Sequence, residues 1–248
     1  MQPVLQSLAE TQPSPSLQPE VSMQPRALSM PPLGRRPSGF RQRPGTAISA
    51  VGAYFAERFE LEVATHHAYV ILCAELDALD APKPLVESVE RAVVEEREHI
   101  EWMRRLASRF AGVPVQDDFG GPASRPRSLS EIAVENMVEG CVRESFAAVI
   151  AGWQASHAKD HEVVEKLRNY AMRKTGHARL AWSIHRWSAK QLDELSRARV
   201  ASAKEFAVYS LRDEIRAEPD PEVRMIAGVP TRMEAERLID GLSVELWA

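Results

Sequence analysis

The sequence predicts an all-α protein built around a bundle of four long helices. Four stretches place apolar residues every three or four positions, which is the spacing that gives a helix one apolar face. Proline falls at the ends of these stretches or between them, where it does least harm to a helix. The connections are short, then long, then short, which is typical of two antiparallel helix pairs joined by a crossover.

Composition indicates the class of protein but not its function. The chain has 248 residues, of which 44% are hydrophobic and 27% charged, as is usual for a globular protein. A net charge of −4 does not indicate a nucleic-acid partner. The two cysteines, Cys73 and Cys141, do not suggest a disulfide framework. We see neither an apolar run of membrane-spanning length nor a secretory signal, so we expect a cytoplasmic protein with no membrane partner.

Residues 1–48 differ from the rest of the chain. They contain nine of the 17 prolines, together with many glutamines and serines. Such a segment cannot bury enough apolar surface to offset the entropy lost on ordering, so we predict a disordered tail. The tail has five arginines and two glutamates. Its basic cluster, residues 34–41, is either a solvated linker or a docking peptide for an acidic protein partner.

The first two predicted helices cover residues 49–79 and about 85–110. Each has charged residues inside an otherwise apolar stripe, namely Glu62 on the first helix and Glu96 with His99 on the second. Glu96 and His99 are three residues apart, so their side chains project from one face of the helix. A carboxylate and an imidazole placed in this way can bind one metal ion from inside a helical bundle.

The second helix pair follows a long connection, residues 111–126, that is rich in glycine, proline and aspartate. The third helix is predicted over residues 128–158 after a capping box, and the fourth over about 160–190. The third helix has two candidate carboxylates, Glu139 and Glu144. Spacing alone does not decide which of them faces inward.

Further helix is expected beyond the bundle, over residues 191–218 and from a second capping box to about residue 246. We expect these helices to cover apolar surface of the bundle. The chain therefore divides into a disordered tail, a bundle and a C-terminal helical part, over residues 1–48, 49–190 and 191–248.

The bundle contains most of the ligands that a di-metal carboxylate site requires. Such a site takes one glutamate from each of two helices and a Glu-x-x-His pair from each of the other two. Carboxylates bridge the two cations, and imidazoles take the outer positions. The candidate metal ligands are Glu62, Glu96, His99, Glu139, Glu144 and His177.

These residues give the chain a resemblance to a known family. Its best pieces are Glu62 with small residues after it, Leu79-Asp80-Ala81-Pro82, Glu95-Glu96-Arg97-Glu98-His99, Glu139-Gly140-Cys141-Val142-Arg143-Glu144 and His177-Ala178-Arg179-Leu180-Ala181-Trp182. Over roughly residues 55–190 the chain resembles the ferritin-like di-iron carboxylate superfamily, and in particular bacterial ferritin-like proteins whose fourth helix reads Asp-Glu-x-x-His-Ala-x-Leu-Ala-Trp. The resemblance implies a ferritin-like four-helix bundle with a long crossover between helices 2 and 3. It also implies bound iron, or manganese as an alternative, and activation of dioxygen or peroxide.

One position departs from the pattern of that family. The fourth helix reads Arg173-Lys174-Thr175-Gly176-His177, so Lys174 stands where the pattern has a glutamate. A cation thus replaces a metal-binding anion. Two like charges 4 Å apart repel by about 4 kcal/mol at an effective dielectric constant near 20. The resemblance therefore predicts a modified site.

Three arrangements of the modified site are open at this point. Lys174 could point outward and leave a weakened site made of the remaining ligands. It could instead take the place of one metal, with its ammonium paired to Glu96 or Glu144, and this is the arrangement that we expect. In the third arrangement His66, one turn after Glu62, acts as a substitute ligand.

The function that we expect is that of a ferritin-like protein with an impaired di-metal site, holding one or two iron ions or none, and with weak or no oxidoreductase activity. One alternative is an oxidase, oxygenase or ferroxidase whose site is intact enough to work. Another is a metal-free bundle that acts as a scaffold or binding module and recruits a protein partner through its arginine-rich tail. Assembly into homo-oligomers is compatible with each of these functions.

Overall fold

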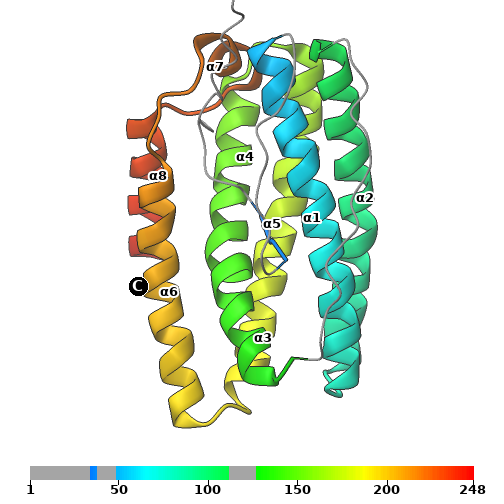
Figure 1. Ribbon diagram of the computed structural model, residues 1–248, viewed down its shortest axis with the longest axis vertical. Helices are drawn as coiled ribbons and strands as arrows, with labels where there is room; N and C mark the ends of the chain where they lie inside the picture. The colour runs from blue at the N-terminus through cyan, green and yellow to red at the C-terminus, as the bar shows by residue number, and fades with distance from the viewer. Residues whose placement is uncertain (1–33, 38–48, 112–126) are drawn as a thin grey trace, which may run out of the picture.

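The computed structural model describes residues 34–37, 49–111 and 127–248, and all regular structure within these ranges is helical (Figure 1). The all-α prediction is therefore confirmed for the described part of the chain. None of the described helices combines the length and the apolar character needed to cross a membrane. The disorder predicted for the tail concerns mainly residues 1–33 and 38–48, which lie outside the described residues.

The first two helices, α1 (Ala50–Ala78) and α2 (Lys83–Ala111), form an antiparallel pair and contact each other along their length. Ser49 joins the start of α1 to the end of α2. Its hydroxyl oxygen accepts a hydrogen bond from the backbone N–H of Gly52 at 3.0 Å and donates one to the carbonyl of Phe110 at 2.8 Å. This cap thus satisfies a free N–H of the first turn of α1. It also joins α1 to α2 at the end of the pair that lies opposite the α1–α2 turn.

The second pair begins with three helical segments that follow one another without a gap, α3 (Leu129–Glu135), η1 (Asn136–Glu144) and α4 (Ser145–His157). They run antiparallel to α5 (His161–Ala189). The central segment, η1, is a π-helix of nine residues, whereas the sequence predicts ordinary α-helix there. π-Helical segments are rare and occur frequently at functional sites. The two pairs pack against each other, with α2 beside α5 (Figure 1).

A glycine in the π-helix allows unusually close packing around it. A Cβ atom added at Gly140 would lie 2.7 Å from the Cβ atom of Ala181 on α5 and 2.5 Å from Nη2 of Arg35. Both distances are shorter than any normal van der Waals contact between such atoms. The glycine in η1 therefore permits α5 and the arginine of the N-terminal segment to approach its backbone closely.

The C-terminal part consists of α6 (Glu194–Glu214), α7 (Pro221–Ala227) and α8 (Arg232–Glu245). The helix α6 packs on η1 and α3, and α8 packs on α4. The indole N–H of Trp247, just after α8, donates to the carbonyl of Cys141 at 3.3 Å. The short helix α7 was not predicted, because the prolines before it and at its start indicate that the preceding helix ends there. Pro221 occupies the first turn of α7, where no backbone N–H is needed for a helical hydrogen bond.

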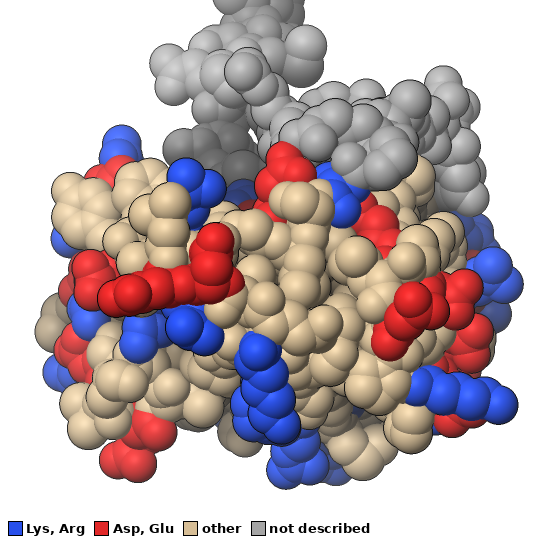
Figure 2. All heavy atoms as spheres, turned by 90° about the horizontal axis from the view of Figure 1, so that it is seen from below, with Lys and Arg blue, Asp and Glu red and all other residues tan. Residues whose placement is uncertain are grey.

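At the end of the bundle that carries the α1–α2 and α5–α6 turns, the described residues form no large area of one charge. Figure 2 looks onto this end and shows lysines and arginines interspersed with aspartates and glutamates, with uncharged surface between them.

The close packing at Gly140 can be tested with alanine. Gly140→Ala should lower the free energy of unfolding by about 1–3 kcal/mol, because the new methyl group overlaps Ala181 in a filled space. Gly152→Ala on α4 is the matched control, since a Cβ there would meet nothing within 4 Å. The control should be neutral or more stable by about 0.5–1 kcal/mol, because alanine favours helix. Urea unfolding measures both, and equal stability of the two variants would contradict the packing described.

Candidate metal centre

The middle of the bundle contains a cluster of buried charged side chains. The structure brings together five of the six candidate ligands, and it adds the lysine that departs from the family pattern. Every member has at most 2% of its surface exposed. The cluster consists of Glu62 from α1, Glu96 and His99 from α2, Glu144 from η1, and Lys174 and His177 from α5.

Lys174 lies at the centre of this cluster. Its Nζ atom donates a hydrogen bond to Oε1 of Glu96 at 2.9 Å. The same atom is 3.2 Å from Oε2 of Glu62 and 3.7 Å from Oε2 of Glu144. One ammonium group thus contacts a carboxylate from each of three helices.

The surroundings keep this lysine charged. Burial alone would lower the pKa of Lys174, but the nearby carboxylates of Glu144, Glu62 and Glu96 raise it well above 10.5. Burial would raise the pKa of Glu96, yet Lys174 and His99 hold it well below its usual range. The pair at 2.9 Å is therefore an ammonium and a carboxylate. Burial and the neighbouring Glu96 raise the pKa of Glu62, although Lys174 and Arg58 oppose that rise.

Two further groups hold Glu62 from the opposite side. Its Oε1 atom accepts hydrogen bonds from the hydroxyl of Tyr170 at 2.6 Å and from Nη2 of Arg58 at 3.0 Å. Arg58 also donates to the hydroxyl oxygen of Tyr170 at 2.8 Å. Glu62 is therefore fixed between a guanidinium and an ammonium. Its Oε1 atom contacts Arg58, and its Oε2 atom contacts Lys174.

The two histidines lie on either side of Glu96. His99 Nδ1 is 3.1 Å from Glu96 Oε2 and 3.8 Å from Glu62 Oε2. His177 Nε2 is 2.8 Å from Oε2 of Glu95, and its Nδ1 is 2.9 Å from Glu96 Oε1 but is not aligned for a hydrogen bond. Burial would lower the pKa of His177, whereas Glu95 and Glu96 raise it to about 9. His177 is thus protonated at neutral pH and connects the buried cluster to the half-exposed Glu95.

A short part of the N-terminal segment closes the cluster at Glu144. Residues 34–37 cross between α1 and the continuous helix formed by α3 and η1 (Figure 1). The backbone N–H of Arg35 donates to Glu144 Oε1 at 2.9 Å, and its carbonyl accepts from the hydroxyl of Thr65 at 2.7 Å. Gly34 has a φ of +108°, and a Cβ there would lie only 3.4 Å from Nζ of Lys174. Only glycine suits this position without strain.

The arginines of this segment bind acidic residues of the same chain. The guanidinium of Arg35 is fully buried and donates to Glu135 at 3.0 Å and to Asn136 at 2.6 Å. Arg36 forms two hydrogen bonds of 2.9 Å with Glu139. The sequence assigned these four residues to a tail; in the structure they pack into the bundle, where α3 supplies Glu135 and η1 supplies Glu139 and Glu144 as their acidic contacts.

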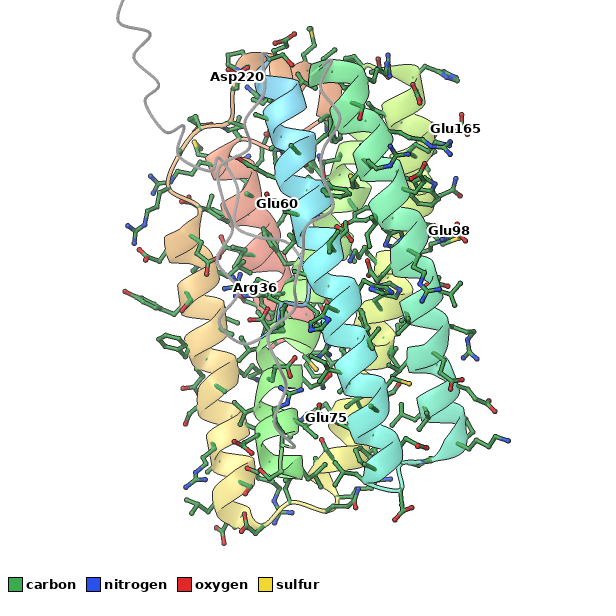
Figure 3. All side chains as sticks on the ribbon, turned by 45° about the vertical axis from the view of Figure 1, so that its right-hand side comes forward. Arg36, Glu60, Glu75, Glu98, Glu165 and Asp220 are labelled. Carbon is green, nitrogen blue, oxygen red and sulfur yellow. The ribbon has the colours of Figure 1, made fainter. Side chains whose placement is uncertain are left out.

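Several residues that the sequence suggested for the metal site, or next to it, lie outside the buried cluster. Glu139, the sixth candidate ligand, pairs with Arg36 and is not part of the cluster, so Glu144 is the glutamate of the third helix that faces inward. His66 accepts a hydrogen bond from Arg97 at 3.3 Å and belongs to neither group of possible metal ligands described below. Arg173 points outward to pair with Glu98 at 2.8 Å; Figure 3 shows Glu98 projecting from the outer side of α2.

Among the residues that the structure describes, two groups of buried side chains could hold a metal ion, and they share Glu96. One comprises Glu62, Glu96 and His99, and the other Glu96, Glu144 and His177. Carboxylates and imidazoles suit iron or manganese. The position of Lys174 does not suit either metal, because its charged nitrogen contacts carboxylates of both groups. Two carboxylate oxygens have no hydrogen-bond partner among the described residues, namely Glu62 Oε2 and Glu144 Oε2. Both face the ammonium of Lys174 and not a metal position. The residues present therefore do not fit a metal while Lys174 holds its place.

Sequence reasoning missed four parts of this network. Arg58 is four residues before Glu62, and this spacing for an ion pair on one helix face could have revealed it. Tyr170 and Thr65 sit in apolar stripes, where nothing distinguishes them from packing residues. The contact through the backbone N–H of Arg35 has no sequence signal, because every residue except proline has the same donor.

The raised pKa of His177 predicts a pH-dependent stability. A histidine whose pKa rises from 6.5 to about 9 on folding stabilises the fold fully below pH 6.5, and this contribution is lost as the pH rises through 9. In urea unfolding with a chelator present, His177→Gln should therefore lose less stability than the wild type between pH 6.5 and pH 9. His161→Gln, at the exposed start of α5, is the control and should follow the wild type. Parallel curves for His177→Gln and the wild type would contradict the charged state assigned to His177.

Comparisons of the chain with family models, with characterised proteins and with solved structures find no match. Family membership is therefore not shown, and the chemistry of the buried cluster is the basis for assigning a function.

Proposed function

We propose that the chain is a ferritin-like bundle in which Lys174 takes the place of metal ions, and that it acts as a scaffold or binding module with weak or no oxidoreductase activity. The supporting observation is the contact of one ammonium nitrogen with Glu96 at 2.9 Å and with Glu62 at 3.2 Å. The two antiparallel pairs and the long connection between α2 and α3 agree with a ferritin-like arrangement.

The cluster is electrostatically balanced without a metal. Three buried carboxyl groups, those of Glu62, Glu96 and Glu144, face three cationic groups. The ammonium of Lys174 forms ion pairs with all three carboxyl groups. The guanidinium of Arg58 pairs with Glu62, and the protonated imidazole of His177 pairs with Glu96. Buried charges of one sign need such partners, because the desolvation of an unpaired carboxylate costs several kcal/mol. A metal ion would bring further positive charge into a site that is already neutralised.

The substitution also determines the chemistry that is open to the site. An ammonium group neutralises carboxylates as a metal does, but it cannot change its oxidation state or coordinate dioxygen. While Lys174 stays in place, the bundle therefore lacks the redox centre that the resemblance implies. What remains is a rigid, closed core that holds four helices in register and presents their outer surfaces for binding.

An iron- or manganese-dependent oxidase, oxygenase or ferroxidase is the second candidate, and the two groups of buried donors favour it. Such a metal, when bound, supplies the capacity to react with dioxygen or peroxide. This function requires Lys174 to leave the cluster or lose its proton. The raised pKa of Lys174 opposes the loss of the proton, and complete burial of the side chain opposes its departure.

Metal content after expression in iron-supplemented medium separates the two candidates. We expect wild-type protein to contain close to no iron or manganese per chain by elemental analysis. Lys174→Glu should bind up to two ions, because it restores the carboxylate that the family pattern has at this position and removes the repelling charge. Lys166→Glu is the matched control, since it makes the same change of charge on α5 at a side chain that is 30% exposed.

The control should remain as free of metal as the wild type. Two metal ions in each wild-type chain would overturn the proposed function and favour the oxidase. Absence of metal from Lys174→Glu, with the variant folded by circular dichroism, would show that position 174 is not what disables the site.

A further inference from the structure

A groove runs along the outside of the bundle between the first half of α2 and the second half of α5. Its volume is about 580 Å³. This lies in the range of pockets that hold small organic molecules. Glu95 and His177 line it together with residues of both helices, so one wall of the groove adjoins the buried cluster. Neither the resemblance nor the proposed function assigns it a role.

The walls of the groove are largely apolar. Leu85 and Ala92 contribute from α2, and Leu180 and Trp187 contribute from α5. Leu180 is 8% exposed, while Leu85 and Trp187 are half-buried, so part of their apolar surface faces the groove. A flat indole and aliphatic side chains favour a ligand with an apolar body, which would gain by leaving water.

Two arginines provide positive charge in the same groove. Arg91 on α2 and Arg179 on α5 both line it and are exposed, and neither pairs with a carboxylate of any described residue. Arg91 donates to the hydroxyl of Ser88 at 2.7 Å. The hydroxyls of Ser88 and Ser183 themselves donate to carbonyls of their own helices, at 2.6 Å and 2.9 Å. The arginines are thus the groove's main donors for a ligand.

We propose that this groove binds a small molecule with an apolar ring or chain and one carboxylate. Guanidinium groups recognise a carboxylate through paired, charge-assisted hydrogen bonds. The carboxylate of Glu95 lies in the same groove, where His177 holds it, and it disfavours a ligand with several negative charges. The inference does not depend on the proposed function, because the two arginines and the apolar walls that carry it lie outside the buried cluster, which the groove meets only at His177.

The test uses 2-naphthoate as the probe and 2-naphthamide as its uncharged counterpart of nearly the same shape. Isothermal titration calorimetry with full-length protein at low salt should show one 2-naphthoate per chain. The naphthoate should bind at least tenfold more tightly than the amide, because charge-assisted hydrogen bonds are about twice as strong as neutral ones. Raising the salt concentration should weaken the binding of 2-naphthoate but not that of 2-naphthamide.

Two variants locate the binding in the groove. The double variant Arg91→Gln/Arg179→Gln changes only exposed side chains and should weaken naphthoate binding at least tenfold while leaving the amide unchanged. Gly176→Trp should abolish binding of both probes, since a Cβ at this groove-lining glycine meets nothing within 4 Å and the indole would fill the space. Gly176→Ala is its control and should bind as the wild type does.

Three results would overturn the inference: no heat of binding with millimolar 2-naphthoate, equal affinity for naphthoate and amide, or unchanged binding in the double variant. The double variant decides the matter even if Gly176→Trp is unstable. Metal content is a separate measurement, so a failure here leaves the proposal for Lys174 untouched.

Discussion

The contact between the ammonium of Lys174 and three buried carboxyl groups is the interaction on which the centre of this protein depends. Glu62, Glu96 and Glu144 come from α1, α2 and η1, and none has access to water. Without a cation among them their mutual repulsion and desolvation would oppose folding. Lys174 on α5 supplies that cation, at 2.9 to 3.7 Å from each of the three. Four helical segments thus meet at one nitrogen atom.

The N-terminal segment and the π-helix complete this arrangement. Glu144 ends η1, and one of its oxygens accepts the backbone N–H of Arg35 while the other faces Lys174. The fit requires a glycine at position 34 because of its positive φ, and a glycine at position 140 because Arg35 and α5 approach there. Buried ion pairs add little net stability compared with apolar packing, so their better-attested role is to fix one arrangement among several. Here they fix which carboxylate oxygen faces the lysine.

Much of the fold could be predicted from the sequence. The four bundle helices lie within about two residues of the predicted ranges, because long apolar stripes and prolines at their ends are strong signals. Glu62, Glu96 and His99 could be recognised because they interrupt such stripes, and the pairing of Lys174 with Glu96 follows from the charge that it brings. The π-helical path of residues 136–144 could not be predicted, because nothing in the sequence of this stretch distinguishes it from an ordinary α-helix.

The docking of residues 34–37 was missed for a related reason. Composition describes a segment of many residues, and proline, serine and glutamine outweigh two arginines in that average. Those arginines nevertheless pair with acidic residues of α3 and η1 that lie about a hundred residues further along the chain. The groove between α2 and α5 likewise arises only when the two helices come together, since neither Arg91 nor Arg179 is unusual within its own helix.

The central claim is that a charged Lys174, rather than a metal ion, neutralises the buried carboxylates. Nitrogen-15 NMR of lysine side chains in metal-free protein tests it most directly, with Lys174→Arg used to assign the signal. A buried, hydrogen-bonded ammonium should give one signal at neutral pH that is protected from exchange with water. That signal should persist unchanged when one equivalent of paramagnetic Mn²⁺ is added per chain. Absence of a protected signal, or its selective broadening at stoichiometric Mn²⁺, would contradict the claim.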